Sequence, residues 1–288
     1  MPDRLRALWD FDDLDASGSR LSAQLAEEST PAGRAEVLTQ LARVEGLRGN
    51  FDEGERLIEE AEPLAGSSEL ARARVDLERG RLRRSSGNPT VAYPLFVSAY
   101  ALADEAHELF VAADAAHMAA LTAPDDAAFS DWTQRGIELL EGAEPADRYW
   151  LGPLLNNLGW HHFGAGAYEQ ALDAFERALS ERERNLDDRS ENELALYAVA
   201  KTLRVLRRPQ EGVPLLERAI ASADAEGRQD GWLEEELAET CAALGRTSEA
   251  REHAGRALML LRGQDSDLEL DGERGSRLRE LASGSKSA

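Results

Sequence analysis

The sequence has little of what a secreted, membrane-spanning or disulfide-bonded protein needs. Its 288 residues contain one cysteine, Cys241, so no disulfide can form within the chain and a reducing compartment is indicated. No apolar run approaches the roughly 20 residues that a membrane helix requires. Residues 1–15 are acidic, whereas a signal peptide has a basic start followed by an apolar run. These features predict a cytoplasmic protein without a membrane partner.

Aromatic side chains and positive charges are also scarce. Aromatic residues make up 6% of the chain while hydrophobic residues make up 42%, and alanine and leucine dominate among them. That composition favours helices that pack in thin layers over a sheet protein. The chain has 33 basic and 55 acidic residues, a net charge of −22, which argues against nucleic acid as the main partner.

What the sequence does contain is a helix-turn-helix pattern, clearest in residues 151–184. Gly166 ends the first helix, and Tyr168 opens the second by packing back across the turn. Each helix has apolar residues spaced three or four apart, which places them on one face. The stripe residues are Leu155, Leu158 and Gly159 on the first helix, and Ala171, Phe175 and Ala178 on the second.

This pattern, with Leu-Gly in the first helix and Ala-x-x-x-Phe in the second, resembles the tetratricopeptide repeat. Weaker copies occur along the chain, and the small residue that opens each second helix marks them. The marker residues are separated by 38, 36, 43, 41 and 38 residues, more than the family's usual period of about 34. They are Gly54, Ala92, Ala128, Ala171, Gly212 and Ala250.

The resemblance implies an all-α fold, a right-handed superhelical solenoid of about six antiparallel helix-turn-helix repeats. We expect residues 31–262 to form the solenoid, with residues 1–30 as an N-terminal cap. Residues 263–288 are expected to form an acidic, partly disordered tail with a short capping helix around Leu278 and Leu281.

Two proline pairs support this repeat register. Pro89 with Pro94, and Pro209 with Pro214, fall at identical places in two of the weaker copies. The first proline of each pair is expected to begin a second helix, where its missing N–H has no partner to lose.

In this family the first helix of each repeat lines a concave groove, and the resemblance therefore implies which residues bind a ligand. Asparagine side chains can hold the amides of an extended peptide, cationic side chains can hold its carboxylates, and Trp160 and Tyr197 offer an apolar seat. The alternative is that the polar groups are merely solvated or paired with neighbouring carboxylates. The predicted residues are Arg43, Arg74, Arg81, Arg84, Asn156, Asn157, Trp160, Tyr197, Lys201 and Arg204.

No pattern in the sequence indicates catalysis, a cofactor or a metal. The histidines lack the i, i+4 spacing with a carboxylate that helical zinc sites use, and there is no Gly-rich phosphate loop. Cys241 falls at a packing position, which predicts a buried apolar role.

We therefore predict a non-catalytic scaffold that binds a protein or peptide, with an acidic segment or a C-terminal carboxylate as the ligand feature. A ligand-sensing regulator is one alternative, and its second surface would be the acidic stretch 101–147, which has Arg135 as its one base. An enzyme is another alternative, which a pocket near residues 122–126 with a buried histidine–carboxylate pair would favour. Association of copies through the solenoid ends is also left open.

Overall fold

The computed structural model describes residues 3–184, 189–264 and 272–284. Within these residues it contains α-helices, short 3-10 turns and no strand, so the prediction of an all-α fold of helical hairpins is confirmed. The chain divides into two compact units, Met1–Leu154 (unit 1) and Leu155–Ala288 (unit 2). Each is described by itself.

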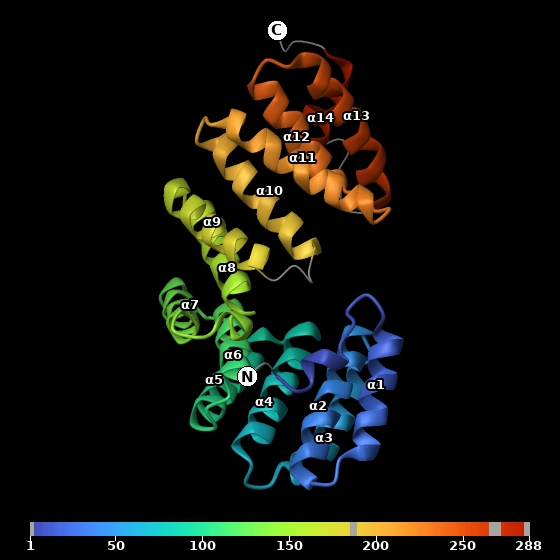
Figure 1. Ribbon diagram of the computed structural model, residues 1–288, viewed down its shortest axis with the longest axis vertical. Helices are drawn as coiled ribbons and strands as arrows, with labels where there is room; N and C mark the ends of the chain where they lie inside the picture. The colour runs from blue at the N-terminus through green and yellow to red at the C-terminus, as the bar shows by residue number, and fades with distance from the viewer. Residues whose placement is uncertain (1–2, 185–188, 265–271, 285–288) are drawn as a thin grey trace. The chain divides into compact units, whose positions relative to one another are not determined.

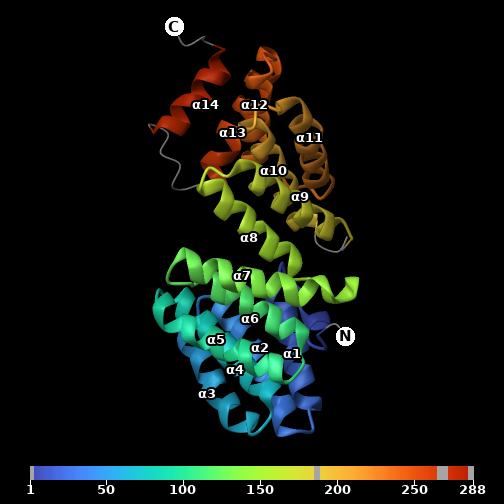
Figure 2. The ribbon, with the colours of Figure 1, turned by 90° about the vertical axis from the view of Figure 1, so that its left-hand side faces the viewer.

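Unit 1 consists of successive antiparallel helices joined by short turns (Figure 1, Figure 2). A 3-10 turn, η1 (Arg6–Leu8), precedes them, and a second, η2 (Pro145–Asp147), follows. The helices are α1 (Leu14–Glu27), α2 (Pro31–Leu47), α3 (Phe51–Ala65), α4 (Glu69–Ser85), α5 (Pro89–Glu105), α6 (Leu109–Leu121) and α7 (Asp126–Glu141).

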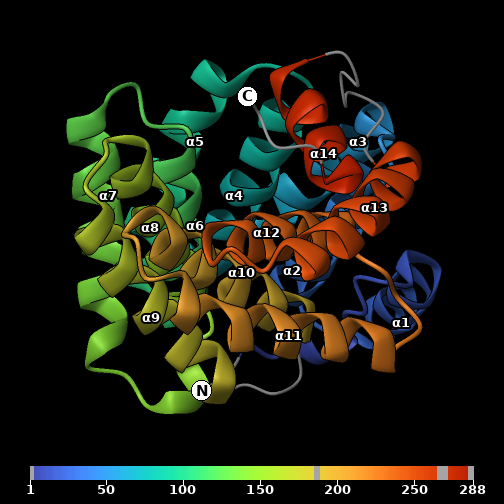
Figure 3. The same cartoon turned by 90° about the horizontal axis from the view of Figure 1, so that it is seen from above.

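Unit 2 continues the same arrangement and ends with a single helix that lies beside α13 (Figure 3). Its first helix begins at the end of unit 1. The helices are α8 (Leu151–Gly164), α9 (Tyr168–Arg184), α10 (Arg189–Val205), α11 (Pro209–Ala225), α12 (Gly231–Ala243), α13 (Thr247–Gln264) and α14 (Glu273–Ser283).

The hairpins pack through the small residues that marked the repeats. Five of these residues are buried, and Ala128 of the weakest copy is half-buried. Gly80 of α4, which is not one of these markers, is another close contact: an added Cβ would be 2.5 Å from the ring of Phe96 of α5. A glycine is therefore required there for the two helices to approach.

The turns within hairpins use residues with left-handed backbone. Gly87, Gly166 and Gly245 each precede a second helix by two positions and have positive φ angles. Arg207 occupies the same place before α11 with a φ of 62°, although an arginine is strained in this conformation.

The expected helix starts are observed. Pro89 and Pro209 are the first residues of α5 and α11, and Pro94 and Pro214 follow inside these helices. Pro31 begins α2, and the Thr30 hydroxyl accepts a hydrogen bond from the Gly33 N–H at 3.0 Å, as a capping residue does.

Apolar side chains from both ends of the described chain are buried against neighbouring helices. Leu5 and Leu21 are buried against Val37 and Val44 of α2. Leu278 of α14 is buried against α12 and α13. The acidic stretch 264–273 and the tail 283–288 lie mostly outside the described residues, so the expectation of disorder there stays a prediction.

Candidate functional site

Within each unit, the first helices of several successive hairpins contact one another and form an inner layer. In unit 1 the inner helices are α2, α4 and α6, and in unit 2 they include α10 and α12. We call the side chains that bridge successive inner helices the inner face. The predicted binding residues come from these helices and from α8.

In unit 1 the inner face holds a buried group of paired charges. The Arg81 guanidinium pairs with Glu78 at 3.2 Å and with Asp114. The Arg43 guanidinium lies 3.8 Å from Glu78 and 3.9 Å from Asp114. Burial raises the pKa of Glu78, and the two guanidinium groups oppose that rise. Arg43 and Arg81 thus serve the packing of α2, α4 and α6.

The N-terminal segment, residues 3–11, lies on the same inner face. The Asp3 carboxylate accepts a 2.7 Å hydrogen bond from Arg74, whose guanidinium also lies 3.4 Å from Glu36. Trp9 Nε1 donates to the side chain of Gln40 of α2 at 3.0 Å. The predicted binding residue Arg74 is therefore buried beneath the chain's own segment.

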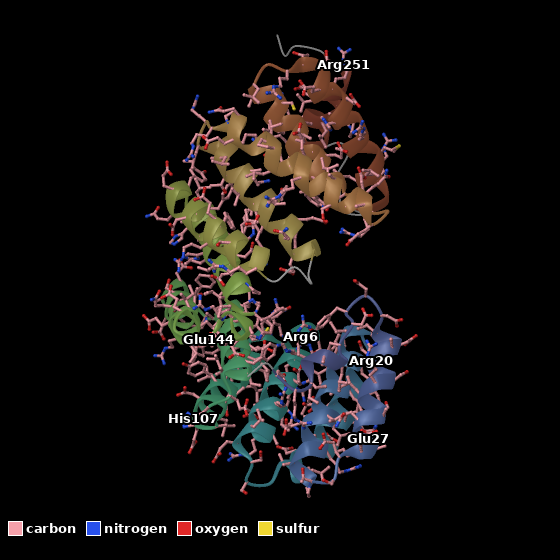
Figure 4. The ribbon with its side chains drawn as sticks, viewed as in Figure 1. Arg6, Arg20, Glu27, His107, Glu144 and Arg251 are labelled. Carbon is pink, nitrogen blue, oxygen red and sulfur yellow. The ribbon has the colours of Figure 1, made fainter. Side chains whose placement is uncertain are left out.

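Aromatic rings hold this segment further along the face. The Arg6 guanidinium lies 4.5 Å from the centre of the Tyr149 ring, and the Arg43 guanidinium lies 5.3 Å from that of Trp9. Figure 4 labels Arg6 in this segment. The cavity that remains beside these residues measures about 20 Å³, too small for a peptide side chain. Of the four unit 1 arginines in the prediction, Arg84 is the exposed one.

In unit 2 the inner face presents aromatic rings from successive inner helices. Trp160 of α8 is 36% exposed, and its ring centre lies 6.4 Å from that of Tyr197 of α10. Trp232 of α12 is 42% exposed. Tyr197 and Trp232 line one cavity of about 820 Å³, formed by α10, α12 and α14. We call this cavity together with Trp160 the unit 2 groove.

The cationic residues predicted on this face are also paired with a carboxylate. The Arg204 guanidinium donates to Glu236 Oε2 at 3.0 Å. The Lys201 ammonium donates to the Tyr197 hydroxyl at 2.9 Å and lies 3.7 Å from Glu236. Burial lowers the pKa of Lys201, but Tyr197 and Glu236 outweigh it, and the net pKa is raised. Lys201 is therefore charged at neutral pH.

The structure adds groove residues that sequence reasoning missed. Asn156 and Asn157 are half-buried on α8, and their part in binding stays a prediction. The repeat pattern does not indicate Trp232, which lies at the very start of α12, and it predicts only a cap for the helix that contains Arg274 and Arg277. The latter two line the groove with Glu235 and Glu239 of α12.

The remaining cysteine and histidine side chains, which could in principle act as nucleophiles, bases or metal ligands, lie in the following surroundings. Cys241 is 1% exposed, and burial raises the pKa of its thiol, in agreement with the predicted apolar role. His117 lies one helical turn from Asp114 on α6, and His253 Nδ1 is 2.6 Å from Glu234. Among the described residues, no three histidine, cysteine or acidic side chains group as metal ligands do.

The geometry can be set beside known proteins. The model of the tetratricopeptide repeat family matches residues 154–191, which include α9 and nearly all of α8. The match covers the stretch with the clearest hairpin pattern. Residues 154–191 of this chain thus match the tetratricopeptide repeat.

Solved structures agree with this fold. A signal transduction ATPase with a tetratricopeptide repeat sensor from Pyrococcus horikoshii superposes on 96% of the chain with a TM-score of 0.72 and 14% identity, and the chain covers 42% of that protein. The apo quorum sensor NprR from B. thuringiensis has a TM-score of 0.60 and 12% identity, with 94% of this chain and 83% of that one covered. BtubC from P. vanneervenii has a TM-score of 0.61 and 16% identity, with 74% and 92% covered.

At these identities the likeness concerns the fold alone. The chain spans less than half the length of the first of these proteins. A comparison with curated protein sequences found no match. None of the described helices is long and apolar enough to cross a membrane.

Proposed function

We propose that this repeat protein is a non-catalytic scaffold whose unit 2 groove binds an extended segment of a partner protein. The observation that carries the proposal is the row of rings formed by Trp160, Tyr197 and Trp232 beside a cavity of about 820 Å³. Large exposed aromatic side chains are costly to leave in water and are typical anchors of protein interfaces.

Polar groups beside the rings suit a peptide backbone. The Lys201 ammonium has three donors, of which one is given to Tyr197 and another faces Glu236 at 3.7 Å. A donor is thus left for a carbonyl or a carboxylate of the ligand. Asn156 of α8 has a side-chain amide. Its C=O and NH₂ groups can pair with the N–H and C=O of a peptide unit.

Unit 1 is the less suitable surface because its inner face is already occupied. Asp3 and Trp9 contact Arg74 and Gln40, which a ligand would otherwise meet. Some carboxylates of the acidic stretch 101–147 are likewise engaged within the chain. Asp114 is buried with Arg81, Asp125 caps α7, and Asp131 pairs with Arg135. A sensing role through that stretch stays a weaker proposal.

The test is selection of peptides from a random phage-displayed library on the full chain. Binding is then measured for Trp160→Ala and Tyr197→Phe variants. We expect the Trp160 substitution to weaken selected peptides about tenfold or more, as loss of an aromatic anchor does. Met259→Ala is the matched control, because Met259 is 66% exposed in the same unit but lies outside the groove. Selected peptides that bind the Trp160 variant as well as the parent would contradict the proposal.

A further inference from the structure

The inner side of α12 carries a stripe that combines an aromatic ring with two carboxylates. Trp232, Glu235 and Glu239 follow one another at three- and four-residue spacing, so they lie on one face of the helix. All three line the unit 2 groove. An exposed ring flanked by carboxylates is the usual surrounding of a bound guanidinium or ammonium group.

The chain itself places guanidinium groups on this stripe. The Arg274 carbon Cζ lies 3.8 Å from the centre of the Trp232 ring, and its Nε donates to Glu235 Oε1 at 2.8 Å. The Arg277 Nε donates to Glu239 Oε1 at 3.0 Å. Both arginines come from α14, three residues apart, and they show how the stripe holds a pair of cationic side chains.

An apolar contact also anchors α14, independently of these arginines. Leu278 is buried against Ala238, Ala254 and Leu261, and that contact fixes the helix on unit 2. The side chains of Arg274 and Arg277 are 33% and 46% exposed, so water screens their pairing with the carboxylates. They can leave the stripe by side-chain rotation while Leu278 remains in the core.

We infer that the Trp232–Glu235–Glu239 stripe receives arginine or lysine side chains of the partner segment, which take the places of Arg274 and Arg277. The partner segment is therefore basic, with two cationic side chains about one helical turn apart. This inference rests on the proposed function and names the ligand class for the same groove. It agrees with the net charge of −22, which attracts a basic segment before contact.

The opposite expectation, an acidic or carboxylate-bearing ligand, depends on Lys201 and Arg204. Both lie within reach of the buried carboxylate of Glu236, so their charge is partly compensated inside the groove. Glu235 and Glu239, in contrast, form ion pairs with the arginines of α14. The two expectations give opposite results in one experiment.

The probe is a labelled synthetic peptide with blocked ends and the sequence of residues 273–283, ERGSRLRELAS. A twin peptide carries neutral citrulline at the positions of Arg274 and Arg277. Binding by fluorescence anisotropy is compared for the full chain and for its Arg274→Ala, Arg277→Ala double variant. We expect the double variant to bind the peptide about tenfold more tightly than the parent, and the citrulline twin about tenfold more weakly than the peptide.

Two further variants control for indirect effects. Arg279→Ala changes the same helix at a residue that donates a hydrogen bond to Ser276, and this variant should bind the peptide like the parent. Adding Glu235→Gln and Glu239→Gln to the double variant should remove its expected gain in affinity for the peptide. Circular dichroism melting identifies any variant that fails to fold.

Equal binding of the citrulline twin, or tighter binding of a twin with glutamate at both positions, would overturn the inference. The proposed function is judged separately with the library-selected peptides. If binding of the selected peptides depends on Trp160 while binding of the α14 peptide does not depend on its arginines, the groove is supported as the binding site and the basic ligand class is rejected. If binding of neither the selected peptides nor the α14 peptide depends on the groove residues, both the proposed function and the basic ligand class are rejected.

Discussion

Gly159 of α8 touches the ring of Phe175 of α9, and a Cβ added to the glycine would lie 2.4 Å from Phe175 Cε1. Such a contact leaves no room for a methyl group without moving the second helix. We expect Gly159→Ala to lower the free energy of unfolding by about 1–2 kcal/mol, because overpacking costs about 1–3 and alanine regains up to about 1 in helix propensity.

Urea unfolding followed by circular dichroism measures this change. Gly164→Ala is the matched control at the end of the same helix, since no atom lies within 4 Å of its added Cβ. The control should be neutral or slightly more stable. A Gly159 variant as stable as the Gly164 variant would show that the two helices are not in this contact.

Removing the ring tests the same packing from the other side. Phe175 is fully buried among Ala171, Leu203 and their neighbours. Phe175→Ala should lower the free energy of unfolding by about 3–5 kcal/mol, as buried aromatic truncations do. An unchanged melting temperature would exclude the burial described here.

The hairpins were predictable from the sequence because their signals are local. Glycine before a second helix, proline at its first residue and small residues at the crossing each act within one hairpin, so Gly166, Pro209 and Ala171 could be placed without tertiary knowledge. The ion pairs of the inner face could not be predicted from the sequence. Glu78 comes from the repeat next to that of Arg43, and Glu236 comes from the repeat next to that of Lys201. The sequence spacing of Arg43 and Lys201 does not reveal which carboxylate each of them will contact.

Arg207 offers a test of turn strain. Its φ of 62° is where the equivalent turns have glycine, and a left-handed residue with a side chain costs about 1 kcal/mol. Arg207→Gly should therefore raise the free energy of unfolding by about 1 kcal/mol or slightly less, since glycine also gains freedom in the unfolded chain. The reciprocal Gly166→Ala, at the same place before α9, should lower it. Changes of the same sign in both variants would contradict this account.

Arg81 and Arg84 separate a structural role from a binding role on α4. Arg81 pairs with the buried carboxylates of Glu78 and Asp114, whereas Arg84 is exposed. Arg81→Ala should cost about 3–5 kcal/mol because it leaves buried charge without its partner. Arg84→Ala should change stability by less than about 0.5 kcal/mol. Thermal and urea unfolding of both variants decide the point.

His117 makes stability depend on pH. Its Nδ1 atom is buried, and burial lowers the pKa to about 4, with Arg81, Arg84 and Arg43 adding to the fall and Asp114 opposing it. The unfolded chain, with an ordinary pKa near 6.5, binds the proton first as pH falls. This histidine therefore removes stability between about pH 6.5 and pH 4, by up to about 3 kcal/mol.

In the His117→Gln variant the side chain cannot bind a proton, so the free energy of unfolding should fall less over the same pH range. Urea unfolding at pH 7 and pH 4.5 provides the comparison. His161→Gln is the control for the loss of a half-buried histidine elsewhere. Parallel pH curves for the parent and the His117 variant would show that the imidazole is not buried in its neutral form.

The burial of Cys241 has a practical consequence for studying the groove. It is the one cysteine of the chain, it is 1% exposed, and burial raises the pKa of its thiol, so it will react slowly with maleimide reagents. A cysteine introduced at Ser276 would then be the fast-reacting thiol. A single dye could be attached beside Trp232 without first removing the native sulfur, and its emission would report on occupancy of the groove in real time.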